Sequence, residues 1–355
     1  MRLLHCQLLT LLVVTARVQA SISPSQRRNL VRSFNPHRNV SSSTTPLQVG
    51  NGDFAFGADI TGLQTFSHFA IESTWAWHNF SLPTTPGQTL PSGLNWWTHD
   101  RLVNYDMPNP AEEDISNWLI ENPQRLSVAN IGLFFGRDNV TEDQLVEKSQ
   151  DLDLWVGKIH STFRYKGSEV SVQVWCHPTL PTVGIEIKSD LLKTENLGVF
   201  FDFPYSDTSK FDAPYVGVWN DTLHNNVKLH SNPSTASFEH VIDSNINQIM
   251  AKWNSGASVS GPLPGSNKFV LNSSNSDTLR LVVAFDATAN SQDNLPTYDN
   301  IVAASKEWWT DYWVSGAFVD LSATKNANAT ELQRRIILSQ YLVAVNEASH
   351  NPPQG

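Results

Sequence analysis

The sequence predicts a mainly β protein, a large antiparallel β-sandwich that is followed by helices at its C-terminal end. Apolar and polar residues alternate from Leu47 to about Phe285, as they do in strands that bury one face. Clusters of Asn, Ser, Gly and Pro, such as 254–267, separate these stretches and are typical of turns. After Ala289 the apolar spacing changes to three and four residues, which indicates helices.

The alternation is clearest in five stretches, each of which we expect to be a strand. They are 54–60, 170–176, 183–187, 199–203 and 279–285. Lys166-Gly167, between two strand patterns, predicts a hairpin turn. Ile115, Trp118 and Leu119 recur at helical spacing and predict a short inserted helix over 112–121. Short strands joined by turns in this way favour an antiparallel sandwich.

The first twenty residues have the pattern of a signal peptide. Arg2 gives a positive start, 8–14 is an apolar run, and Val18-Gln19-Ala20 is a small-residue cleavage site. No later run approaches the roughly 18 apolar residues that a membrane helix needs. We therefore expect a secreted, extracellular protein without a membrane anchor. The polar stretch 21–46 is interpreted as an extended entry segment.

Acceptor sequences for N-glycosylation agree with the secretory route. Six asparagines have Ser or Thr two positions later, with no Pro between. They are Asn39, Asn79, Asn139, Asn220, Asn272 and Asn328. The sequence therefore predicts a glycoprotein.

Charge and composition restrict the class of ligand. The net charge of -10 becomes -12 once Arg2 and Arg17 leave with the signal peptide, and Lys and Arg do not cluster, so nucleic acid is not an expected partner. Charged residues make up only 16% of the chain, while there are 12 tryptophans. This balance suits a neutral, hydroxyl-rich ligand such as a carbohydrate, because indole rings stack on apolar sugar faces.

Cysteine and histidine placement argues against metal and thiol chemistry. Cys6 leaves with the signal peptide, so Cys176 has no disulfide partner in the mature chain. Cys176 and His177 are adjacent, so on a strand they point to opposite faces, and a buried thiol is the favoured interpretation. The histidines are scattered without a His-Glu-x-x-His motif, and no phosphate or dinucleotide loop is present. We expect neither a metal nor a cofactor.

Two C-terminal helices are predicted. Ile301, Ser305, Trp308 and Tyr312 form one stripe, which Trp309 and Trp313 widen. A second helix is expected to begin with Thr330 as N-cap and Gln333 three residues on. Its apolar face needs a partner, so we expect 330–346 to be loosely docked and to promote self-association.

Several segments resemble the six-hairpin glycosidases, the group that includes glycoside hydrolase families 65 and 95. Val49–Phe56 with Thr61–Phe66 resembles the opening of their large sandwich domain. The resemblance continues through 75–78, 118–119, 122–123, 152–155, 177–178 and 203–205, and ends at 331–342. It covers nearly the whole mature chain.

The residue patterns and the resemblance together imply a domain plan. The segments would be a signal peptide (1–20), an entry segment (21–46), a galactose-mutarotase-like supersandwich (47–289), a helical linker (290–329) and the first helix of an (α/α)6 barrel (330–355). Gly355 stands where relatives have Glu, so the chain is expected to be truncated before the catalytic barrel.

The resemblance also implies an inverting attack on a glycosidic bond, with one Glu as general acid and a second carboxylate that activates water or phosphate. Such carboxyl groups stand roughly 6.5–9.5 Å apart. In the family both come from the barrel, so the catalytic residues are unknown on this chain. We expect the first part of a secreted glycoside hydrolase that is inactive alone. A non-catalytic carbohydrate-binding or structural sandwich is the alternative.

The sandwich is expected to contribute to the rim of the sugar pocket. Trp75 and Trp77 would project from one face if their segment is extended, and His78 could donate to a sugar hydroxyl. Core packing of the indoles remains the alternative. A third hypothesis, sugar chemistry on the sandwich itself as in aldose epimerases, needs a His and a carboxylate that converge.

Three further residues are candidate substrate contacts. Asn51 and Asp53 flank glycines that suit a tight turn, where capping of backbone amides is the favoured alternative. Gln64 is a candidate only because it lies within the Thr61–Phe66 segment that resembles the family. Trp96-Trp97 is a second aromatic pair, for which packing is favoured over stacking on a ligand.

Overall fold

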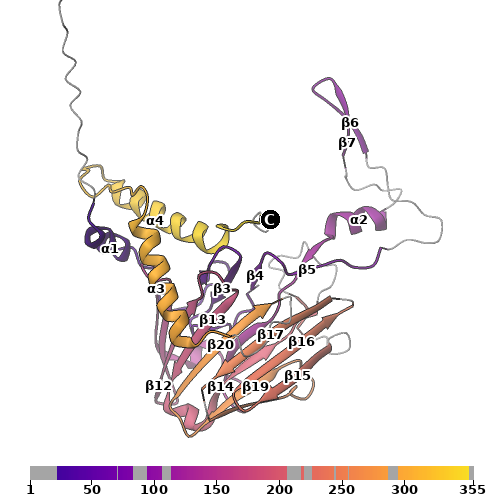
Figure 1. The fold of residues 1–355 in the computed structure, drawn as a ribbon, viewed down its shortest axis with the longest axis vertical. Helices are drawn as coiled ribbons and strands as arrows, with labels where there is room; N and C mark the ends of the chain where they lie inside the picture. Colours follow the sequence, from indigo (N-terminus) through magenta and orange to yellow (C-terminus); the bar gives the residue numbers. More distant parts are fainter. Residues whose placement is uncertain are drawn as a thin grey trace, which may run out of the picture.

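The computed structural model describes residues 22–69, 71–82, 94–105, 113–205, 217–219, 226–243, 245–254, 256–286 and 295–351, and their main body is a layered antiparallel β structure (Figure 1). The predicted signal peptide and Asn220 lie outside the described residues.

The larger layer is a nine-stranded sheet in the order β1-β10-β11-β12-β13-β20-β17-β16-β15, with every neighbouring pair antiparallel. Its strands are β1 (His37–Arg38), β10 (Val146–Asp153), β11 (Lys158–Tyr165), β12 (Ser168–Cys176), β13 (Thr182–Lys188), β20 (Thr278–Asp286), β17 (Asn245–Trp253), β16 (Thr235–Ile242) and β15 (Asn226–Asn232). The predicted turn at Lys166-Gly167 joins β11 and β12, and both residues have positive φ, 48° and 81°.

Smaller sheets complete the sandwich. One has the order β18-β19-β14-β9 and another β2-β3-β4. Their strands are β18 (Ala257–Ser260), β19 (Phe269–Ser274), β14 (Thr194–Asp202), β9 (Asn130–Phe134), β2 (Leu47–Gly50), β3 (Phe54–Ala58) and β4 (Glu72–Ser73). Two ribbons remain, β5 (Trp77–His78) with β8 (Gln124–Arg125), and β6 (Leu94–Thr98) with β7 (Arg101–Tyr105).

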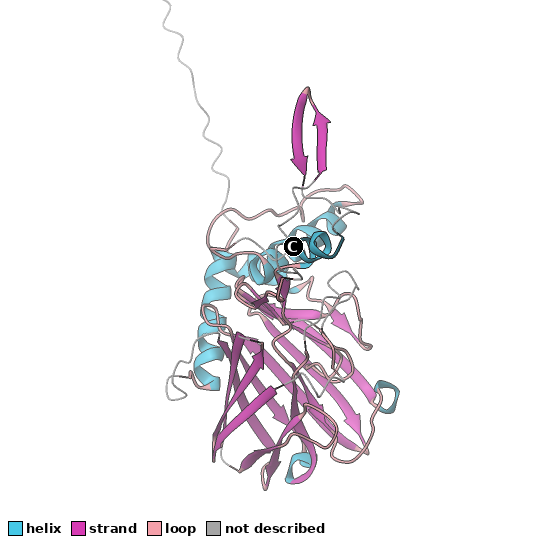
Figure 2. Ribbon diagram, turned by 90° about the vertical axis from the view of Figure 1, so that its right-hand side faces the viewer, coloured by secondary structure: helices cyan, strands magenta, loops and turns pink. Residues whose placement is uncertain are grey.

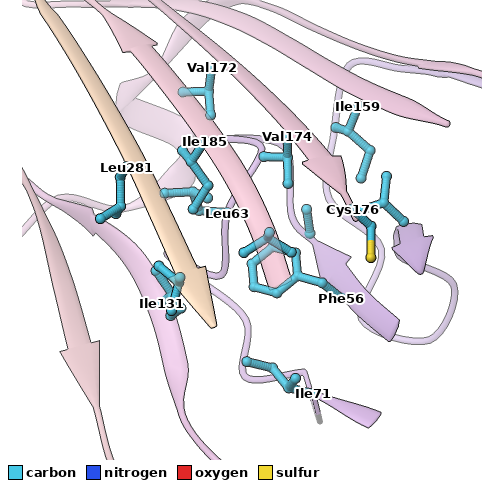
Figure 3. Packing of buried hydrophobic residues seen from close by; sticks show 14 of the residues in the cluster. Phe56, Leu63, Ile71, Ile131, Ile159, Val172, Val174, Cys176, Ile185 and Leu281 are labelled. Atoms are coloured by element: carbon cyan, nitrogen blue, oxygen red, sulfur yellow. The ribbon is translucent and has the colours of Figure 1, made fainter. Parts of the chain in front are cut away.

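The layers meet in one apolar core. Phe201 of β14 packs on Phe238 of β16 with ring centroids 4.9 Å apart, and Phe54 of β3 stacks on Phe285 of β20 at 5.0 Å. Aliphatic residues from both layers, among them Ile131 and Val174, fill the space between them (Figure 3). The predicted large antiparallel β-sandwich is therefore confirmed.

The entry segment is not extended as predicted. Pro24–Arg32 forms helix α1, in which Ser23 and Gln26 make a reciprocal capping box and Pro24 occupies the first turn. The Arg27 guanidinium donates to the carbonyl oxygens of Trp313 and Val314, at 3.0 and 3.2 Å. Local capping and this distant contact favour a helix where a polar composition suggested none.

Helix α3 (Tyr298–Val314) covers part of β12, β13 and β20, and the predicted short helix is present as α2 (Glu113–Glu121). The buried line of α3 runs through Ile301, Ser305, Trp309 and Trp313 at a constant spacing of four. Trp308 and Tyr312, which the sequence placed at the centre of the stripe, are only partly buried and lie beside it. Short 3-10 turns are η2 (Glu142–Gln144) and η3 (Asp190–Lys193).

Helix α4 (Ala329–Asn346) begins earlier than predicted. Its N-cap is Asn328, and Thr330 lies inside the first turn. The Gln333 amide instead bonds the Leu321 N–H and the Val319 carbonyl, at 2.7 and 3.0 Å, so it fixes the preceding loop. No helix among the described residues is long and apolar enough to cross a membrane.

The prediction that α4 docks loosely is wrong. Ile337, Tyr341 and Val345 are fully buried, and the Tyr341 hydroxyl donates to the carbonyl of Gln48 on β2 at 2.9 Å. The Tyr341 ring also stacks on Trp309 of α3, with centroids 4.6 Å apart. These contacts seat one face of α4 on the sandwich and on α3 (Figures 1 and 2).

Replacing Trp309 by Ala should cost about 3–5 kcal/mol in the free energy of unfolding, because the indole is 3% exposed and joins α3 to α4. Trp308→Ala is the matched control and should cost clearly less, since Trp308 is only partly buried. Urea unfolding of both variants gives the comparison. Equal losses would mean that Trp309 is not part of the core.

Candidate functional site

The Gly50–Asp53 loop is held by the side chain of Asn51. Its Oδ1 accepts from the amides of Asp53 and Phe54, at 3.2 and 3.0 Å. Its Nδ2 donates to the carbonyls of His177 and Leu180, at 3.0 and 2.9 Å. Asn51 therefore caps backbone groups, which is the alternative that the sequence favoured, and its amide is occupied within the protein.

The C-terminal end of α4 meets this loop. The Gly52 N–H donates to the Val345 carbonyl at 2.8 Å, and a Cβ at Gly52 would lie 2.4 Å from the Ala348 carbonyl oxygen. The φ of Gly52 is 91°, so both the backbone conformation and the lack of space for a Cβ require glycine at this position. Ser349 hydrogen-bonds the Asp53 carboxylate. We call residues 50–53, 74 and 345–351 the loop–helix joint.

Thr74 ties the joint to the predicted tryptophans. Its N–H donates to the Asp53 carbonyl at 2.9 Å, and its hydroxyl accepts from Asn351 Nδ2 at 3.4 Å. Its own carbonyl accepts from the indole N–H of Trp77 at 3.2 Å. Thr74 is thus hydrogen-bonded both to Asp53 and to Trp77, which were predicted from separate motifs.

The segment that carries the tryptophans is a turn at Thr74–Trp75 rather than an extended strand, and the Trp77 N–H donates to the Trp75 carbonyl at 3.1 Å. The condition under which both indoles would share one face is therefore not met. Trp75 packs against the main core, and Trp77 is also partly buried. Their contact with sugar stays a prediction.

His78 is 1% exposed, and both its ring nitrogens are engaged. Nδ1 lies 3.1 Å from the Asn245 amide nitrogen and accepts from it, so Nε2 carries the proton and donates to Asp243 at 3.1 Å. The ring packs edge-on to Phe80 at 4.7 Å. His78 thus links β5 to the β16–β17 turn by hydrogen bonds. Because both ring nitrogens are engaged in these bonds, neither is available to a sugar hydroxyl.

The structure places Gln64 inside the core. Its side chain has no exposed surface, and Nε2 donates to the carbonyls of Gly57 and Phe69, at 3.1 and 3.3 Å. Its Oε1 accepts from the Ile131 N–H at 3.3 Å. Gln64 links its loop to β9 inside the core, where a ligand cannot reach it.

The Trp96-Trp97 pair does not pack as predicted. The β6–β7 hairpin stands away from the sandwich (Figures 1 and 2), with Trp96 53% and Trp97 74% exposed. Trp97 lies opposite Leu102, which is 54% exposed. On the same face, the Asn104 amide donates to Asn95 Oδ1 at 2.9 Å.

A buried polar pair was missed by the sequence reasoning. His240 on β16 and Asn247 on β17 face each other in register, at 0% and 7% exposure. Neither ring nitrogen of His240, nor Nδ2 of Asn247, has a hydrogen-bond partner. The signal was a histidine at an inward position of the alternating run Phe238-x-His240-x-Ile242.

The epimerase-like hypothesis needs a carboxylate beside such a histidine. Phe201 packs on Phe238, the inward neighbour of His240, whereas the next residue, Asp202, faces the other way toward Lys268, at 3.6 Å. Burial raises the pKa of Asp202, but its carboxylate lies on the side of β14 opposite to the histidine. His240 and Asp202 therefore do not converge.

Cys176 is buried, and burial raises the pKa of its thiol far above the ordinary value, as the buried-thiol interpretation requires. Within the described part of the chain, no group of three or more His, Cys, Asp or Glu residues is placed to hold a metal ion. Of the predicted glycosylation sites, Asn39, Asn79, Asn139 and Asn328 are exposed. Asn272 is half-buried within β19, with its Oδ1 enclosed.

Comparison with known proteins gives fold neighbours. No family model and no curated protein matches the sequence. A protein assigned as a kojibiose phosphorylase, from the human microbiome, aligns with 92% of this chain and 40% of its own, at 10% identity and a TM-score of 0.49. A family GH92 inverting mannosidase from Bacteroides thetaiotaomicron VPI-5482 aligns with 82% of this chain and 36% of its own, at 11% identity and a TM-score of 0.37.

A bacterial glucoamylase in complex with acarbose aligns with 52% of this chain and 31% of its own, at 10% identity and a TM-score of 0.35. The chain thus spans about two fifths or less of the length of these three proteins. At such identities the likeness assigns no ligand and no activity to this chain.

Trp77→Ala should lower the free energy of unfolding by only about 1–2 kcal/mol, because the indole is partly buried and makes one hydrogen bond. It should also weaken retention on an immobilised oligosaccharide by about 1 kcal/mol. Thermal melting and affinity electrophoresis measure the two effects. A loss of stability equal to that of Trp309→Ala, with retention unchanged, would make Trp77 a core residue.

Acid should destabilise the protein through His240. Burial lowers the pKa of His240 to about 4, whereas the unfolded chain has the ordinary value of 6.5. Below 6.5 the unfolded state binds a proton that the folded state does not, so stability falls between pH 6.5 and 4. His240→Phe should remove about 2–3 kcal/mol of this loss between pH 7 and 4.5.

Asp59 has the opposite effect on stability: burial raises its pKa to about 6, so stability rises as the pH falls. Because Asp59 is present in both the unsubstituted chain and His240→Phe, its effect cancels when the two are compared. Urea titrations at several pH values test the difference. Parallel pH profiles for the two proteins would contradict it.

Proposed function

We propose that this chain is the β-sandwich portion of a secreted glycoside hydrolase, and that it cleaves glycosidic bonds only together with a helical catalytic domain. The loop–helix joint is the observation that carries the proposal. It fixes the end of α4 to the Gly50–Asp53 loop through Val345 and Ser349. Asn351, which follows α4, thereby lies beside Thr74, whose carbonyl accepts from the Trp77 indole N–H at the predicted rim.

The outer face of α4 supports a helical neighbour. Leu332, Leu342 and Val343 are 52%, 45% and 48% exposed, and Ile336 is half-buried on the same side. Leu332, Ile336 and Val343 are four and seven residues apart and form one stripe along the helix, and Leu342 lies to one side of it. Such a stripe suits a packed helix, as the first helix of an (α/α)6 barrel would have. In the isolated chain it would promote self-association.

The described carboxylates beside the rim, Asp53 and Asp243, are both engaged in hydrogen bonds within the protein. Asp53 accepts from Thr74 at 3.5 Å and from Ser349, and Asp243 accepts from His78 at 3.1 Å. Each therefore serves a structural contact. Inversion needs two carboxyl groups with a nucleophile between them, and we assign both to the helical domain. The sandwich would shape the rim and hold the barrel in place.

A carbohydrate-binding sandwich without catalysis is the second candidate. It is favoured by the β6–β7 hairpin, where Trp97 is 74% exposed beside the amides of Asn95 and Asn104. An exposed indole flanked by amides matches the apolar face and the hydroxyls of a sugar ring. In either case, the exposed sequons at Asn39, Asn79, Asn139 and Asn328 fit secretion and glycosylation.

The purified chain 21–355 should release no monosaccharide from α-linked disaccharides or fucosides. The same chain, extended through any reading frame that continues after the Gly355 codon, should release it, and Glu→Gln substitutions in the added helices should abolish release. Reducing-sugar assays against a mock purification measure this. Activity of the chain alone would refute the proposal, and the absence of a continuing frame would favour the binding sandwich.

A further inference from the structure

The His240–Asn247 pair stands out among the described residues because three of its enclosed polar atoms have no partner. The two residues are direct neighbours across β16 and β17, so their side chains share a face of the sheet. Buried polar groups are almost always hydrogen-bonded, and each exception calls for an explanation. Removing such groups from water without a partner is unfavourable, and here it is repeated on adjacent side chains.

The pair lies near a residue that holds the predicted rim. Asn245 comes two residues before Asn247 on β17, so both side chains point to the same face. Asn245 donates from Nδ2 to the Trp77 carbonyl and to His78 Nδ1, both at 3.1 Å. The Trp77–His78 strand therefore contacts the turn end of the β16–β17 hairpin, two residues along β17 from the pair.

The chemistry of the pair is that of a receptor for a neutral group. Burial lowers the pKa of His240 to about 4, so at neutral pH its ring offers one N–H donor and one nitrogen acceptor. Asn247 adds a donor through Nδ2. The Phe203 ring, edge-on to the imidazole at 5.5 Å, adds an apolar wall.

We propose that His240 and Asn247 bind a hydroxyl group of a neutral sugar, which enters when the Trp77–His78 strand lifts from the β16–β17 hairpin. A hydroxyl both donates and accepts, so one group can satisfy the imidazole and the amide together. A charged group would lose its hydration against Phe203 and the core without an opposite charge to pair with.

The Trp77–His78 strand can open locally. β5 has two residues and pairs only with the two residues of β8. Beyond that pairing, its described side-chain contacts with the hairpin are those of His78 to Asp243 and of Asn245 to Trp77 and His78. Short pairings of this kind open far more readily than long ladders. The inference shares with the proposed function only the choice of carbohydrate as ligand, since no barrel residue takes part.

Imidazole nitrogen NMR of the ¹⁵N-histidine-labelled mature chain tests the proposal, with glucose, mannose, galactose and fucose as probes. We expect at least one sugar to shift both nitrogen resonances of His240 saturably. His240→Phe should abolish the matching change in backbone amides of β16 and β17, and Asn247→Leu should weaken it at least tenfold. His160→Phe, which removes a histidine that already bonds Ser171 at 3.1 Å, should leave it unchanged.

A water molecule shares the hydroxyl chemistry, and the experiment separates it from a sugar. If no sugar moves the His240 resonances while a bound water gives cross-peaks to its ring, the sugar site is disproved. Binding that survives in His240→Phe/Asn247→Leu would place the sugar elsewhere and overturn the proposal equally. Hydrolysis is not measured here, so failure of this site leaves the proposed function untouched.

Discussion

The stacking of Tyr341 on Trp309 fixes the relation between the helices and the sandwich. The Tyr341 ring is fully buried, lies 4.6 Å from the indole, and donates its hydroxyl to Gln48 on β2. A buried phenol needs such a partner, because its O–H cannot reach water. Since α3, α4 and β2 all meet at this ring, the position of the end of α4, and with it the loop–helix joint, follows from it.

Much of the fold could be predicted from the sequence, since a one-sided burial pattern leaves a two-residue period. This holds for 170–176 and 279–285, which became central strands. Prediction failed where distant contacts decided local structure. Arg27 binds the end of α3 and stabilises a helix in a polar segment, and Gln333 bonds a preceding loop instead of capping its own helix. Neither partner can be read from neighbouring residues.

The candidate site was predicted less well, because short motifs do not separate ligand contacts from internal hydrogen bonds. Asn51, Gln64 and His78 occupy motif positions, yet the polar atoms of each side chain hydrogen-bond to other groups of the protein. Conversely, His240 sits in an ordinary strand pattern, and only burial without a partner distinguishes it. Trp97 was expected to pack, but among the described residues no second layer covers the two-stranded ribbon, and the indole is 74% exposed.

The contact between Arg27 and the carbonyl of Trp313 joins residues that are 286 positions apart. During synthesis α1 emerges early, and its partner is made only after every strand of the sandwich. Native contacts of such long sequence separation form late and slow the overall folding rate. The N-terminal helix therefore lacks this partner through most of translation, and the contact can form only after the whole sandwich has been made.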